Sequence, residues 1–179
     1  MRAFGDPKFK PAQQGELDAL CGVYAAANFL FRRLRLSEDC EKRRAHFQRL
    51  LDHLGARKKI TVFRVCEDGF KSGQIQAAFN KTARDLGLKV QARNLGSVLK
   101  KRNAGDLYGL LSSLEDNEAA MVRIENEHHW ILVHSGRNDR ITLDDAYPPA
   151  KCVEVSKSVK RLKAADLVNG LVFLNAPSH

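Results

Sequence analysis

The segment that follows Asp18 spaces its apolar residues as an α-helix does, and this pattern restricts the fold more than any other in the chain. Val23, Ala27, Leu30 and Leu34 recur at the helical period of about 3.6 residues, which a strand does not produce. Asp18 is a candidate N-cap, because its short carboxylate can accept the unpaired N–H groups of a first turn. The sequence therefore predicts a core helix that begins at Asp18.

Cys21 falls at about the third position of this predicted helix. The unpaired N–H groups and the helix dipole stabilise a thiolate there, and the thiolate is the nucleophilic form. Gly22 is expected to leave room for a substrate backbone. Free cysteines are also among the most buried residue types, so this segment alone leaves two interpretations open: a nucleophile or a structural core cysteine.

The length and composition indicate a single globular domain, residues 1–179. No apolar run reaches the roughly 18 residues that cross a membrane, and the N-terminus has no apolar stretch typical of a signal peptide. We therefore expect no membrane association and a cytoplasmic protein, or one exported by a specialised secretion system. The four cysteines are widely spaced without a CxxC pair, so neither a zinc knuckle nor a disulfide framework is predicted.

The net charge of +9 raises the question of an acidic or nucleic-acid partner. Basic residues form short clusters along the whole chain and no single basic arm. Solvated surfaces account for such a distribution, so nucleic-acid binding is not favoured as the main function. The sequence does not indicate the oligomeric state.

The N-terminal half is predicted to be mainly helical and the C-terminal half mainly β. Further amphipathic patterns predict a helix that Ser37 caps and Gly55 ends, another over residues 72–87, and a third over residues 107–114. Strand patterns occur at residues 59–66, 88–92, 119–124, 152–155 and 171–174, with a short helix at residues 164–168.

Residues 127–147 predict a β-hairpin. Its first strand is nearly continuously apolar, which is typical of a central strand covered on both faces. Alternation along this strand puts His129 on one face and both His128 and His134 on the other, so only one of these sets can face Cys21. The hairpin thus brings a histidine onto a strand whose neighbour ends in two aspartates.

These elements can supply the three groups that thiol catalysis needs. A nucleophilic cysteine requires a base that takes its proton and a third group that orients the base. A Cys at a helix start, a His on a central strand and an Asp at the end of the neighbouring strand occur here in that order.

On these residues the chain resembles the papain-like cysteine peptidases, in particular their small bacterial branch, which is similar to the bacteriocin-leader (double-glycine) peptidases. The matching stretches are Gln14 with residues 20–25, residues 129–133, and residues 143–145. The resemblance implies an α+β, papain-like fold. In it, an N-terminal helical part led by the Cys21 helix packs on a C-terminal antiparallel sheet that carries His129 and Asp145.

The resemblance also implies a role for each residue of the site. Cys21 is the nucleophile, and His129 is the general base and then the acid. Asp145, which follows His129 by 16 positions, orients the imidazole. Asp144 is the alternative if the strand end is bulged.

In this family a glutamine before the cysteine donates an amide N–H to the oxyanion, beside the N–H of the cysteine itself. Gln14 lies 7 residues before Cys21, one more than the usual spacing, so Gln14 and Gln13 both remain candidates. No metal is predicted, because His129 and His134 point to opposite faces of their strand, and no other cofactor is expected.

The predicted activity is that of a cysteine peptidase, which hydrolyses an amide of a peptide or protein substrate through an acyl-enzyme. A glutamine deamidase or a transglutaminase-type acyl transferase uses the same thioester chemistry and stays open. A different class also stays open: a non-catalytic module that binds an acidic protein or nucleic acid through its basic surface.

Overall fold

The computed structural model describes residues 20–36, 39–55, 70–104, 107–115, 117–124, 129–134, 142–144 and 170–176. Its helices are α1 (Cys21–Arg33), α2 (Cys40–Gly55), α4 (Ser72–Asp85), α5 (Leu95–Arg102) and α6 (Leu107–Ser112). Its strands are β1 (Val90–Asn94), β2 (Ala119–Ile124), β3 (His129–His134), β4 (Thr142–Asp144) and β5 (Leu171–Asn175). The elements predicted at residues 59–66, 152–155 and 164–168 lie outside the described residues.

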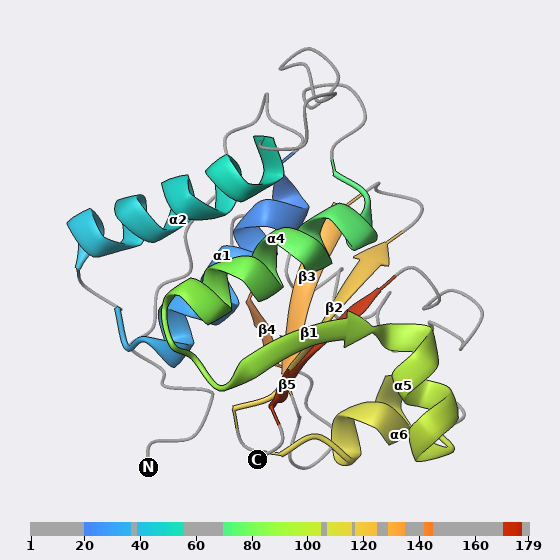
Figure 1. The fold of residues 1–179 in the computed structure, drawn as a ribbon. Helices are drawn as coiled ribbons and strands as arrows, with labels where there is room; N and C mark the ends of the chain where they lie inside the picture. The colour runs from blue at the N-terminus through green and yellow to red at the C-terminus, as the bar shows by residue number, and fades with distance from the viewer. Residues whose placement is uncertain are drawn as a thin grey trace.

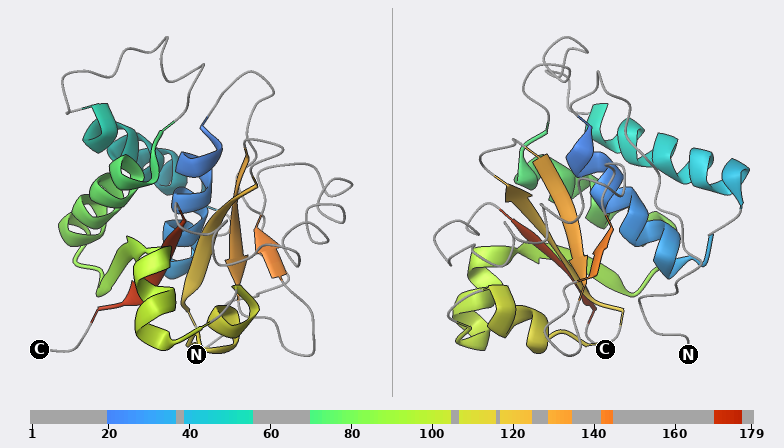
Figure 2. Two further views of the ribbon diagram at one scale, coloured as in Figure 1. Left: turned by 90° about the vertical axis from the view of Figure 1, so that its right-hand side faces the viewer. Right: turned by 180° about the vertical axis from the view of Figure 1, so that it is seen from behind.

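The five strands form one antiparallel sheet in the order β1-β5-β2-β3-β4. The helices α1, α2 and α4 cover one face of this sheet, and α5 and α6 cover the other (Figure 1 and Figure 2). None of the described helices is long and apolar enough to cross a membrane. The α+β class predicted from the sequence is confirmed.

The strand β3 contributes to both cores that the sheet separates. Trp130 and Leu132 belong to the core under α1, α2 and α4, whereas Ile131 and Val133 belong to the core under α5 and α6. All four side chains are buried. The prediction of a central strand covered on both faces is therefore confirmed, and its antiparallel pairing with β4 is that of the predicted hairpin.

Three phenylalanines pack together in the core under α1, α2 and α4. Phe173 of β5 lies with its ring centroid 4.6 Å from that of Phe29 in α1 and 4.6 Å from that of Phe79 in α4. All three are fully buried. Because stacked and tilted aromatic pairs add to the free energy gained by burial, this cluster joins two helices to the middle of the sheet.

The helix α2 begins later than predicted. Its N-cap is Asp39, whose side-chain carboxylate accepts the N–H of Lys42 at 3.0 Å, so the prediction that Ser37 caps this helix is wrong. The Lys42 ammonium also bonds the Asp39 carboxylate, and this hydrogen bond lowers the pKa of Asp39. The spacing of apolar residues predicts the buried face of a helix more reliably than the residue at which the helix begins. The predicted cap therefore lies two positions before the observed one.

The outer edge of β1 is covered by side chains of α4. Alternate residues of β1 pair with β5, so the backbone groups of Ala92 point away from it. The N–H of Ala92 donates to the Asn80 side-chain oxygen at 2.7 Å. The carbonyl of Ala92 accepts from the side-chain amides of Asn80 at 3.1 Å and Gln76 at 3.2 Å. These amides take the place of a neighbouring strand.

Thr82 of α4 is fully buried, and its hydroxyl has no hydrogen-bond partner among the described residues. Burying an unpaired hydroxyl costs roughly 1–3 kcal/mol. Thr82→Val keeps the shape of the side chain and should raise the free energy of unfolding, measured in urea, by about 1 kcal/mol. Thr82→Ala is the control, because the cavity it leaves should lower that free energy. A loss in Thr82→Val would show that the hydroxyl is hydrogen-bonded.

Candidate active site

Cys21 is the first residue of α1, not the third as predicted. The carbonyl of Leu20 accepts the first hydrogen bonds of the helix, from the N–H groups of Val23 at 2.8 Å and Tyr24 at 2.9 Å. Leu20 is thus the N-cap, and no side chain caps this end. The prediction of Asp18 as N-cap is wrong, because the helical hydrogen bonds begin after it. As the first helical residue, Cys21 has a backbone N–H that no carbonyl of its own helix accepts.

The side chain of Cys21 is largely covered. Its exposed fraction is 5%, and it belongs to the core under α1, α2 and α4. Small molecules can therefore reach the thiol of Cys21 only through a small exposed area. Cys40, which is likewise the first residue of its helix, is exposed. The two cysteines therefore share a helix position and differ in burial.

Gly22 lies where α1 comes close to both α4 and β3. A Cβ at Gly22 would lie 2.6 Å from the Cδ1 atom of Ile75 and 3.1 Å from the Cδ1 atom of Trp130. The space beside Gly22 is filled by these two side chains, so the prediction that it admits a substrate backbone is wrong. The absence of a side chain at Gly22 serves the internal packing of the first turn.

The histidine proposed from the sequence begins β3. His129 pairs with Ile124, the last residue of β2, and is followed by Trp130, which is 7% exposed and packs on the α1 side. The next strand ends at Asp144, whose register partner in β3 is Leu132. Asp145, Gln14, Gln13 and His128 lie outside the described residues.

The contact between Gly22 and Trp130 links the two chain segments that carry Cys21 and His129. Each of the contacting residues directly follows one of them in the sequence. The first turn of α1 and the start of β3 lie at the same end of the molecule (Figure 1). The fold therefore joins these two segments, which are more than a hundred residues apart in the chain.

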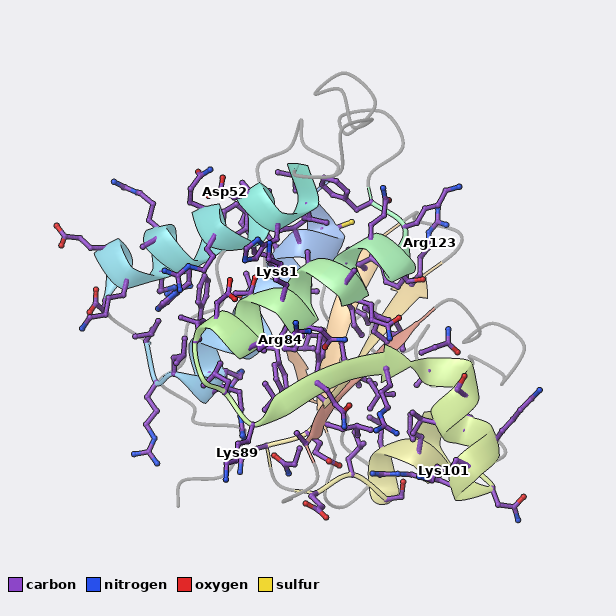
Figure 3. All side chains as sticks on the ribbon, in the orientation of Figure 1. Asp52, Lys81, Arg84, Lys89, Lys101 and Arg123 are labelled. Carbon is purple, nitrogen blue, oxygen red and sulfur yellow. The ribbon has the colours of Figure 1, made fainter. Side chains whose placement is uncertain are left out.

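The described residues contain no group of three or more His, Cys, Asp or Glu side chains that could hold a metal ion. Their exposed basic side chains are spread out: Lys81 and Arg84 lie on α4, Lys89 just before β1, and Lys101 on α5 (Figure 3). On the described part of the chain these basic side chains thus come from separate elements.

No family model matches the sequence. Among curated proteins, the phosphoglucosamine mutase of Aliivibrio salmonicida (strain LFI1238) is 29% identical over 108 residues. The match covers 60% of this chain but only 23% of the mutase. Because so little of the mutase is matched, its activity is not carried over to this chain.

Two solved structures are similar over nearly the whole chain. The peptidase domain of Streptococcus ComA, a bifunctional ABC transporter involved in a quorum-sensing pathway, matches with a TM-score of 0.50 and 15% identity, over 95% of this chain and 99% of that domain. A double-glycine-motif protease from an AMS/PCAT transporter, solved with its leader peptide, matches with a TM-score of 0.41 and 12% identity, over 94% of this chain and 91% of that one. The likeness to the ComA domain shows the fold, so the papain-like architecture predicted from the sequence is confirmed.

Proposed function

We propose that this chain, whose fold is that of a papain-like peptidase domain, is a cysteine peptidase acting on a peptide or protein in the cytoplasm. The packing of Gly22 against Trp130 is the observation that carries the proposal, because it joins the helix start that bears Cys21 to the strand start that bears His129. The fold shared with the ComA peptidase domain supports the same reading.

In the proposed mechanism the Cys21 thiolate, having lost its proton to His129, attacks the carbonyl carbon of the substrate amide. The oxyanion accepts hydrogen bonds from the backbone N–H of Cys21, which its own helix leaves unused, and from an amide N–H of Gln14 or Gln13. Collapse of the tetrahedral intermediate leaves a thioester on the sulfur and expels the amine, which takes its proton from His129.

Water completes the reaction. His129 removes a proton as the water attacks the thioester, and the carboxylic acid leaves while the sulfur becomes a thiolate again. Asp145, or Asp144, orients the imidazole throughout and stabilises its positive charge. The carboxylate acts through the histidine and touches no reacting atom.

The proposal is tested by the reactivity of Cys21 relative to Cys40, followed by peptide mapping after brief exposure to a small vinyl sulfone near neutral pH. Cys40 is the matched control, since it has the same helix position but is exposed. If His129 activates Cys21, then Cys21 should react on the order of tenfold faster than Cys40 despite its burial. Equal or slower labelling of Cys21 would make it a structural cysteine and would end the proposal.

The base is identified by comparing His129→Ala with His128→Ala. The period-two pattern of the sequence groups His128 with Trp130 and His129 with Ile131, so the two neighbouring histidines are alternative candidates for the base. We expect labelling of Cys21 to fall to the rate of Cys40 in His129→Ala and to persist in His128→Ala. The opposite result would assign the base to His128 and overturn the role of His129.

The products separate the three enzyme activities that the sequence left open. New peptide N-termini after incubation with a peptide mixture indicate hydrolysis, whereas glutamine converted to glutamate indicates deamidation and a new isopeptide bond indicates transglutamination. A binding module would give no reaction at Cys21. It would instead bind a polyanion with a steep dependence on salt that Cys21→Ala does not alter.

A further inference from the structure

The first turn of α1 is held between two other elements at Gly22. The Cβ position of this glycine lies 2.6 Å from the Cδ1 atom of Ile75 in α4, and 3.1 Å and 3.4 Å from the Cδ1 and Cγ atoms of Trp130 in β3. Carbon atoms normally pack at about 3.5–4.0 Å, so a side chain at this position requires the terminal methyl of Ile75 to turn away and either Trp130 or α1 to shift slightly.

Of the two neighbours, Trp130 has the less freedom to move. It is 7% exposed and lies on a strand that pairs with β2 along its length and with β4 from Leu132 onward. Its own backbone is in register with Arg123. Ile75 is fully buried, but its contact is made by the last methyl of the side chain, which substitution by valine removes.

We propose that Gly22 and Trp130 are positioning residues of the thiol site. By fixing how closely the first turn of α1 approaches the start of β3, they set the distance between Cys21 and His129. The inference rests on the proposed function, since it concerns the geometry of the same reaction. A displacement of about 1 Å in a catalytic arrangement can cost on the order of a hundredfold in rate.

The test measures the rate of Cys21 alkylation across pH, relative to Cys40, in proteins shown to be folded by circular dichroism. Gly22→Ala should lower the Cys21 rate ten- to a hundredfold and give its pH profile the form of that of Cys40. Gly22→Ala combined with Ile75→Val, which removes the closest clashing atom, should recover most of the rate. Ile75→Val alone should change the rate less than about threefold.

Gly73→Ala is the matched control, because Gly73 also lies in the first turn of a helix but has no atom within 4 Å of its Cβ position. It should leave the Cys21 profile unchanged. If Gly22→Ala proves too unstable to study, Trp130→Ala and Trp130→Phe give the same comparison from the other side. The first should lower the Cys21 rate, and the second, which keeps an aromatic ring against α1, should restore it to within a few fold.

A folded Gly22→Ala protein with the wild-type Cys21 rate and pH profile would overturn the inference and leave the glycine a purely structural role. So would equal Cys21 rates in Trp130→Ala and the wild type. Failure of the proposed function itself is a different result: wild-type Cys21 would then react no faster than Cys40.

Discussion

Phe173→Ala should lower the free energy of unfolding by about 3–5 kcal/mol, because a fully buried phenylalanine is lost and the cavity is too well enclosed to collapse. The ring of Phe173 packs against those of Phe29 and Phe79, both with centroids at 4.6 Å, and its strand lies between β1 and β2. The loss would therefore affect both helices and the middle of the sheet.

Urea denaturation of the wild type and the variant measures this difference. Phe173→Leu is the control, since it keeps most of the apolar volume and should cost less than half as much. Phe47→Ala gives a second comparison, because Phe47 is only partly buried and packs against Tyr24 at the surface of the same core. A loss of less than about 1.5 kcal/mol in Phe173→Ala would mean that the core readily refills the cavity.

Glu118→Ala is the second large effect we expect, a loss of about 2–4 kcal/mol. The carboxylate of Glu118 is 4% exposed and accepts the backbone N–H groups of Glu115 at 3.0 Å and Asn175 at 3.1 Å. It also accepts from the Arg102 guanidinium at 3.4 Å. Its removal leaves two backbone donors without their acceptor and takes away the link through Glu118 between Arg102 of α5 and Asn175 of β5, whereas Arg102 keeps its hydrogen bonds to Ser113.

Two variants separate these contributions when their unfolding is measured in the same way. Glu118→Gln keeps one acceptor oxygen and removes the charge, so it should cost less than Glu118→Ala. Glu115→Ala removes an exposed carboxylate that accepts from the Asn175 side chain at 3.1 Å, and should cost under about 1 kcal/mol. Equal losses in Glu118→Ala and Glu115→Ala would contradict the importance of burial.

Two elements were predicted from the sequence with nearly the bounds that the structure shows. The strand at residues 119–124 has the predicted bounds, and α4 starts at the predicted Ser72 and is followed by Gly87, whose φ of +64° suits a glycine at a helix end. For α4 the helical spacing of apolar residues persists over the whole element, whereas the strand is a nearly continuous apolar run whose short length favours a strand.

The helix α5 was missed because it follows β1 without a break. Asn94 is both the last residue of the strand and the N-cap of the helix, where its side chain accepts the N–H of Ser97 at 3.0 Å. That cap, together with Asn103 in the left-handed conformation at the other end, was the available signal. Eight residues with three buried apolar side chains were otherwise too short a pattern.

The position of β5 between β1 and β2 was beyond prediction from local patterns, since it depends on pairing between residues far apart in the chain. The candidate site likewise combines features that local patterns predict with contacts that they do not. The chain order of Cys21 and His129 and their kinds of element could be predicted, whereas the contact of Gly22 with Trp130 depends on how a helix and a strand pack. A glycine after the cysteine and an aromatic residue after the histidine were the only traces of that contact in the sequence.

The amides of Asn80 and Gln76 on Ala92 have a consequence for how a polypeptide could dock on this protein. A substrate that binds in extended form often extends an existing sheet, and it needs free backbone donors and acceptors to do so. At β1 the N–H and C=O groups of Ala92 are already hydrogen-bonded to side chains of α4. A further strand cannot pair there without displacing the amides of Asn80 and Gln76. Among the described strands the opposite border is β4, which pairs with β3, the strand that His129 begins, so we expect strand addition there rather than at β1.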